Sequence, residues 1–242
     1  MWRDDARGIY YIALKDMRTY YLKPPAISWG IVFPLAWILA FYLRSPRSFD
    51  ELVPGLIAMT VLFSTTAAEA VVINFELRIG SLERLLLAPI SISAVLIGKV
   101  LGGAIFGLLM TAVVTLGSAV GLGLHVNPLY LVLVLVPSAL AFSSLGALLC
   151  VLVKEVFEAQ TLANLPRFLM VFLCGVFYPI SAMPPALQYV AYSLPLTYTV
   201  DGIRQAFSPG ETTTAFVDAF VLITFTALFI FPAVKLLRRR FV

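Results

Sequence analysis

Two neighbouring stretches of this chain contain no charged residue, and they limit the possible fold more than any other feature. Val100–Leu124 and Val126–Val153 each exceed the roughly 20 apolar residues that a helix needs to cross ~30 Å of hydrocarbon. Ala26–Leu43, Leu52–Phe75 and Thr212–Val234 approach the same pattern. Only 12% of the chain is charged and 61% is hydrophobic, whereas soluble domains carry about 25% charged residues. We therefore predict an all-α integral membrane protein.

A further apolar segment, Phe168–Val200, is interrupted by four prolines. One helix cannot continue through them, because proline lacks an N–H donor and clashes with the preceding turn. We expect a fifth span from about Leu162 to Phe177 that leaves regular helix near Pro179, which makes six membrane-spanning helices. Residues 178–207 would form short helical pieces that enter the outer side of the membrane without crossing it. Irregular backbone at that depth is tolerated only against protein or a water-filled cavity, so this re-entrant segment is a candidate functional region.

Lysine and arginine are unequally distributed over the two sides of this six-span arrangement. Fourteen fall on one side, Lys99 and Arg167 among them, and Arg44, Arg47 and Arg204 fall on the other. Cytoplasmic loops of membrane proteins carry the excess of positive residues. We therefore predict a multi-pass protein of the cell (plasma) membrane with both termini in the cytoplasm.

Residues 1–25 are expected to form an amphipathic interface helix on the cytoplasmic side, ahead of the membrane domain 26–242. The helical pattern runs from Arg7 to Leu22 and ends before Pro24-Pro25. Its apolar face consists of Ile9, Tyr10, Ala13, Leu14, Met17, Tyr20 and Tyr21. A basic helix with an aromatic face suits the bilayer interface. The pattern leaves open whether this helix is a passive anchor or also rests on a cytoplasmic partner.

The loop 76–92 is predicted to contain a second short helix on the same side. Gly80 breaks the preceding helix, Ser81 can cap a new one, and Pro89 ends it. Glu83 in the first turn suits the positive end of the helix dipole. A helix of one or two turns is not stable alone, so it needs the membrane interface or a protein socket.

Two groups of motifs resemble those of ABC-2 type permeases. The first is Leu82–Pro89, which reads LERLLLAP, followed by Ile97-Gly98-Lys99. The second consists of Gly175–Ile180, Met183-Pro184, Pro195–Tyr198 and Asp201–Arg204. Met183 stands where leucine is commoner in the family. The resemblance covers essentially the whole chain, in order and spacing.

This resemblance implies one half of an ATP-driven exporter. The implied partners are two copies of a separate ABC ATPase subunit, a second permease subunit (the same chain or a homologue) and membrane lipid. The implied coupling helix in the ATPase groove carries Leu82, Glu83, Arg84, Leu85, Leu86 and Pro89. The implied outer gate carries Gly175, Phe177, Tyr178, Pro179, Pro184, Pro195, Tyr198, Asp201 and Arg204. We expect Asp201 and Arg204, three residues apart, to form an ion pair.

Motifs for catalysis are absent from the sequence. There is no GxxxxGK[ST] loop, HExxH, GxSxG or Cys/His cluster, so we expect no enzyme activity, no nucleic-acid partner and no cofactor on this chain. ATP and Mg²⁺ would bind the partner ATPase. Cys150 and Cys174 are expected to be small buried hydrophobes. The apolar path favours an amphipathic, lipid-like or drug-like substrate, moved out of the cytoplasm or the inner leaflet.

Glu69 is the one carboxylate well inside a predicted span, and intramembrane acids are functional candidates by default. It belongs to a transport pathway or gate, or else it is a hydrated carboxylate or one bonded to Thr65 or Thr66. An ion-gradient-driven secondary transporter is the alternative function, because such proteins need ion sites near the membrane centre. Glu69 is the only residue that offers one.

Overall fold

The computed structural model describes residues 2–23, 52–153, 155–207 and 212–241, with single positions between residues 27 and 43. The described residues are helical and include no strand, which confirms the all-α prediction for this part of the chain. The expected first span, Ala26–Leu43, lies outside the continuously described residues.

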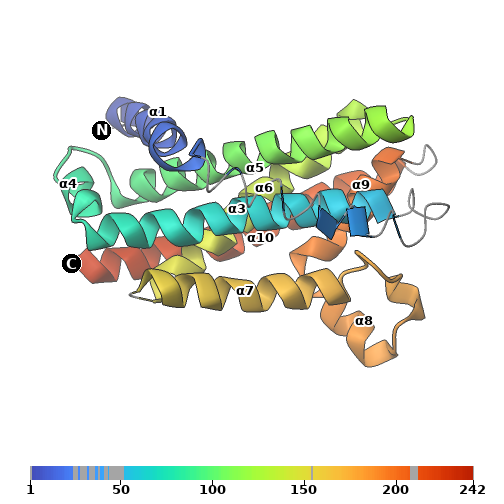
Figure 1. The fold of residues 1–242 in the computed structure, drawn as a ribbon. Coiled ribbons are helices and arrows are strands. Elements are labelled where there is room, and N and C mark those ends of the chain that lie inside the picture. Colours follow the sequence, from blue (N-terminus) through green and yellow to red (C-terminus); the bar gives the residue numbers. More distant parts are fainter. Residues whose placement is uncertain are drawn as a thin grey trace.

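Four long helices run side by side along the bundle (Figure 1). They are α3 (Val53–Arg78), α5 (Ile92–Leu122), α6 (Pro128–Leu152) and α10 (Thr212–Phe241). Each is long and apolar enough to cross a membrane, so the described residues contain four candidate spans. The six-span arrangement remains a prediction.

The helix α5 begins ahead of the charge-free stretch Val100–Leu124. The hydroxyl of Ser91 accepts a hydrogen bond from the Ala94 amide at 3.1 Å and thereby caps the helix that starts at Ile92. Lys99 is consequently a buried residue within α5. The helix ends at Gly123, whose φ of 65° is the left-handed conformation that glycine adopts at helix C-termini.

The helix α7 (Val156–Leu173) begins and ends earlier than expected. The predicted break near Pro179 was wrong, because the chain leaves the helix at Cys174 and turns at Gly175 with φ 82°. Arg167, a residue of the predicted fifth span that the charge distribution places toward the inner side, lies within α7 and is 1% exposed.

Short helices follow α7, as the proline spacing predicts. They are the 3₁₀ turn η4 (Ile180–Ala182), α8 (Pro185–Tyr192) and α9 (Pro195–Phe207). Both α8 and α9 begin at a proline, which suits a first helical position because its missing N–H has no helical partner there. The helix α9 packs between α6, α10 and α3, with Leu196, Val200 and Ile203 completely buried.

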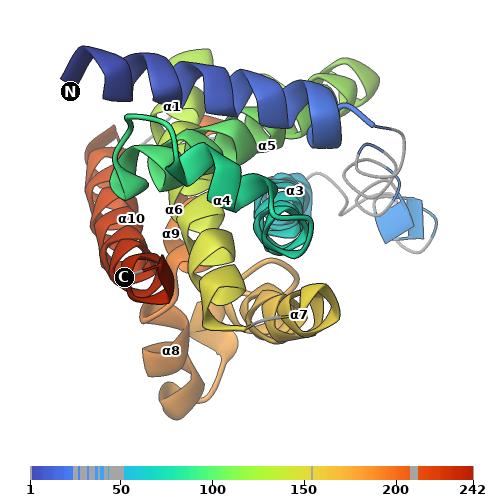
Figure 2. The same cartoon turned by 90° about the vertical axis from the view of Figure 1, so that its left-hand side faces the viewer.

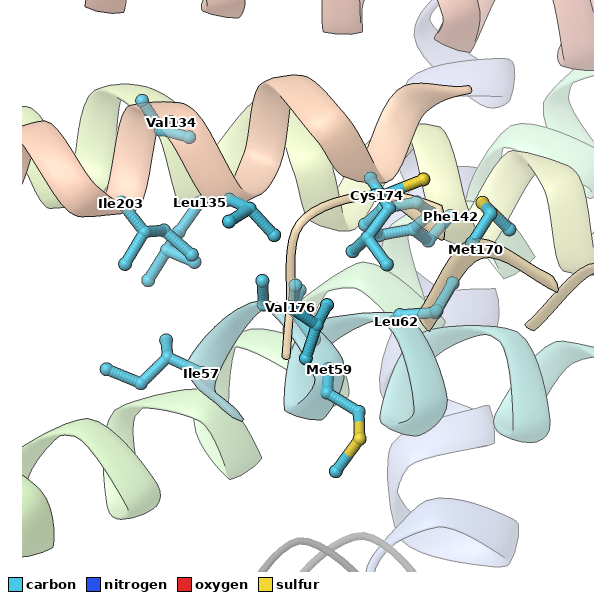
Figure 3. Close-up of a cluster of buried hydrophobic side chains, with 14 of the residues drawn as sticks. Ile57, Met59, Leu62, Val134, Leu135, Phe142, Met170, Cys174, Val176 and Ile203 are labelled. Carbon is cyan, nitrogen blue, oxygen red and sulfur yellow. The ribbon is translucent and has the colours of Figure 1, made fainter. Parts of the chain in front are cut away.

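The main core lies where α3, α6, α7 and α9 meet (Figure 3). Val176 and Cys174, just after α7, pack in this cluster with Met59, Leu62 and Phe142. Both cysteines are free and buried, as predicted. The segment after α7 is therefore fixed to the centre of the bundle.

The two ends of the bundle differ. Both termini and the short helix α4 (Ser81–Leu86) lie at one end, and α8 lies at the other (Figure 1). The N-terminal helix α1 (Trp2–Asp16) continues into a π-helical turn, η1 (Met17–Tyr21). Figure 2 shows α1 lying across the bundle at the end that carries α4, which is the arrangement expected of an interfacial helix.

Candidate functional site

The short helix α4 occupies the position that the sequence predicts. Gly80 has φ 69°, which allows the chain to turn sharply out of α3 and start α4. Leu82 is completely buried in a cluster with residues of α1, α3 and α5. Arg84 and Pro89 are exposed and Leu85 is half-buried, while the side chains of Glu83 and Leu86 are outside the description. The helix is thus anchored on one side and accessible on the other.

An open cleft of ≈ 430 Å³ separates α1 from the α4–α5 connection. Its lining residues are Asp4, Arg7, Gly8, Tyr11, Ile12, Lys15, Leu85, Ala88 and Ile90. The Asp5 carboxylate accepts a hydrogen bond from the Ser91 amide at 2.8 Å, so α1 is fastened to this connection. Residues of α1 and of the α4–α5 region thus line the two sides of one cleft at this end of the bundle.

The packing of α1 differs in detail from the amphipathic prediction. The helix begins at Trp2 rather than Arg7, and Tyr10 of the predicted apolar face is 62% exposed. Ile12 is buried against Gly98 of α5. A Cβ atom on Gly98 would lie only 3.1 Å from the Ile12 Cβ, so the two helices are in close contact at this point. The missing side chain at Gly98 therefore lets α1 approach α5 along Ile12.

A buried cluster of charges joins α1 to α3 and α5, and sequence reasoning missed it. The ammonium group of Lys99 lies 3.1 Å from Asp16 and 2.5 Å from Glu76. Lys15 also pairs with Glu76, and with Asp16 at 3.0 Å. Lys99, Asp16 and Glu76 are each 1% exposed or less. The serine cap before α5 was the available signal, because it places Lys99 inside a helix.

Glu69 lies one layer deeper and contacts η1. Its carboxylate accepts a hydrogen bond from the Tyr21 hydroxyl at 2.9 Å, and both residues are buried. The alternative in which Glu69 bonds to Thr65 or Thr66 is not the one observed, because these hydroxyls donate to carbonyl groups of their own helix. Burial, reinforced by the neighbouring Glu69 carboxylate, raises the pKa of Tyr21 well above its usual value. Glu69 is therefore buried and bonded to the N-terminal segment.

Arg204 links the two ends of the predicted outer segment at the opposite end of the bundle. Arg204 of α9 donates a hydrogen bond to the Gly175 carbonyl at 2.6 Å. The expected pair with Asp201 is present at 3.9 Å. Burial raises the pKa of Asp201, although the nearby Arg204 charge acts in the other direction. Arg204 thus connects the end of α7 to α9.

The remaining residues of the predicted gate occupy two different environments. Tyr178, Pro179 and Pro184 are exposed, whereas Pro195 is buried and Phe177 is half-buried. The half-buried Tyr198 donates its hydroxyl to the Tyr192 carbonyl at 2.8 Å. Within the described ranges, no group of three His, Cys, Asp or Glu side chains is arranged to hold a metal ion.

A comparison with protein families agrees with this geometry. A family profile described as "ABC-2 type transporter" matches residues 7–208. The chain belongs to the ABC-2 type transporter family. It is therefore a membrane transport permease of an ABC transporter, and this membership implies association with an ABC ATPase partner. In this family generally, ATP is hydrolysed on separate subunits.

Individual relatives carry corresponding descriptions. The chain is 28% identical to "Inner membrane transport permease YadH" of Escherichia coli strain K12, over 96% of each chain. It is 24% identical to "Nodulation protein J" of Bradyrhizobium diazoefficiens, over 99% of this chain and 92% of the relative. It is 25% identical to "Probable multidrug ABC transporter permease YbhS" of E. coli, over 74% of this chain and 48% of the relative.

Proposed function

We propose that this ABC-2 permease is the membrane part of an exporter for amphipathic, lipid-like or drug-like molecules. Two copies of a separate ABC ATPase would power it from the end that carries α4. A second permease, identical or homologous, would complete the transport path, with both chains in the cell membrane and their termini in the cytoplasm. The observation that carries this proposal is α4 itself, a helix of six residues anchored by Leu82, with Arg84 and Pro89 exposed beside the α1 cleft.

The contacts of α4 and α1 support transmission of force from this surface into the spans. Leu82 packs in one cluster with residues of α3 and α5, so displacement of α4 moves both helices. The Lys99–Asp16–Glu76 cluster joins α1 to the same two helices. An ATPase that presses on α4 and α1 together would therefore act on α3 and α5 as one unit.

The proposed outer gate lies at the other end. Gly175 and Arg204 connect the ends of α7 and α9, and α9 packs against α3 and α6. Movement of α3 would consequently shift α9 and the hydrogen bond between Arg204 and the Gly175 carbonyl. In the proposed cycle, ATP-driven movement at α4 opens the segment 178–207 and releases the substrate.

The test is ATP-driven transport by vesicles that contain the permease and its ATPase. We expect the double variant Glu83→Ala/Arg84→Ala to insert normally and to lose most ATP-driven transport. Arg238→Ala, at an exposed position near the end of α10, serves as the control and should retain transport. Full transport by the double variant at normal expression would contradict the coupling role of α4. Transport that a proton ionophore abolishes while ATP remains would favour an ion-gradient mechanism instead.

A further inference from the structure

Arg167 of α7 is a buried cation without a carboxylate partner among the described residues. Its side chain is 1% exposed. Nε donates to the Thr66 hydroxyl at 2.5 Å, and Nη1 donates to the Asn164 amide oxygen at 2.9 Å. In the part of the chain that the structure describes, Nη2 has no hydrogen-bond partner. The guanidinium group is therefore held in place by neutral groups, with one nitrogen unused.

This arrangement contrasts with that of Lys99, the other cation that is buried among the described residues. Lys99 is neutralised by two carboxylates, as buried charges normally are. Arg167 has only neutral oxygen partners, although Thr66 lies midway along α3, a candidate span. A charge at such a depth is costly and is found where it serves binding or transport. An anion from outside the chain would supply the missing counter-charge.

The surroundings of Arg167 offer a route from the bilayer. Its guanidinium carbon lies 5.7 Å from the centre of the Phe63 ring, and Phe63 packs edge to face on Phe168. Phe168 is 45% exposed, and the outward face of α7 also exposes Leu165 and Phe172. Figure 2 shows α7 at the edge of the bundle, beside α3. Phe63 and Phe168 therefore connect the cation to the exposed apolar face of α7.

We propose that Arg167 binds the anionic head of an amphipathic ligand that enters from the bilayer between α3 and α7. The head group is a phosphate or a carboxylate, because the planar guanidinium fork matches two oxygens of either group. Nη2 offers one donor, and displacement of Asn164 releases Nη1 as the second. The apolar chain of the ligand lies along Phe63 and Phe168. The inference rests on the proposed function and narrows its substrate class to anionic amphipaths.

Photo-cross-linking of the full-length chain in phosphatidylcholine nanodiscs tests this site without ATP or transport. The probe is a dodecyl phosphate with a diazirine in its chain, compared with the matching diazirine alcohol. We expect the phosphate probe to label peptides of α3 and α7 about tenfold more than the alcohol does. Unlabelled dodecyl phosphate should compete, whereas equimolar inorganic phosphate should not. Equal labelling by the alcohol, or competition by inorganic phosphate alone, would overturn the proposal.

Variants test whether the Arg167 side chain is responsible for this labelling. Arg167→Met should abolish the preference for the phosphate probe, and Arg167→Lys should retain part of it. Lys235→Met, at an exposed position of α10, should behave like the parent chain. Thermal stability is measured for each variant, and the comparison of the two probes on the parent chain stands even if Arg167→Met does not fold. Unchanged labelling of a folded Arg167→Met variant would overturn the site, whereas failed ATP coupling would leave these results untouched.

Discussion

Replacing Lys99 by methionine leaves two buried carboxylates that face a single lysine. Lys99 is 1% exposed and pairs with Asp16 at 3.1 Å and Glu76 at 2.5 Å. Removal of one partner from a buried ion pair costs about 3–5 kcal/mol, because the remaining charge is uncompensated. Lys15 still pairs with both carboxylates, but its side chain is 33% exposed. Solvent screens its charge, so it compensates the two carboxylates only in part. We therefore expect Lys99→Met to lower the free energy of unfolding by about 3 kcal/mol, near the low end of that range.

Thermal unfolding of the detergent-purified protein measures this loss. Lys235→Met is the control, since its exposed charge should contribute less than about 1 kcal/mol. The double variant Lys99→Met/Glu76→Gln leaves one lysine and one carboxylate, so it should recover much of the lost stability. A Lys99→Met variant as stable as the parent would refute the argument from charge. A double variant whose loss of stability exceeds the summed losses of Lys99→Met and Glu76→Gln would also refute it.

Two further substitutions test close packing and the outer connection. Gly103→Ala places a Cβ onto the Glu69 carboxylate and 2.7 Å from the Ser143 hydroxyl. Thermal unfolding should therefore show that the free energy of unfolding falls by about 1–3 kcal/mol. In the control Gly117→Ala the new Cβ meets nothing within 4 Å, so this variant should not be destabilised. Arg204→Ala removes the hydrogen bond to the Gly175 carbonyl. We expect water-soluble thiol reagents to label cysteines introduced along 177–184 faster in this variant. An unchanged labelling rate would show that this hydrogen bond does not hold the segment closed.

The spans and short helices were predictable because their signals are local. Charge-free length places α5 and α6, and proline spacing places α8 and α9. The helix α4 follows from Gly80 and Pro89, which act on adjacent residues, whereas the expected Ser81 cap was wrong, because Gly80 is the N-cap and no side chain caps this helix. Such signals do not depend on which helices become neighbours.

The buried contacts were not predictable in the same way, because they depend on tertiary pairing. Lys99 and Arg167 both count among the inner-side cations in the sequence, yet one meets two carboxylates and the other meets Thr66. The end of α7 was misplaced for a related reason. Gly175 adopts a positive φ where its carbonyl meets Arg204, and this contact joins residues far apart in the sequence.

Site-specific cross-linking to the ATPase would locate the driving subunit. A photoreactive amino acid placed at Arg84, exposed on α4, is compared with the same residue at Tyr189, exposed on α8 at the opposite end. In cells that express the permease with its ATPase, we predict a cross-linked permease–ATPase product from position 84 and none from position 189. A product from position 189, or none from position 84 while the complex remains assembled, would contradict an ATPase seated at α4.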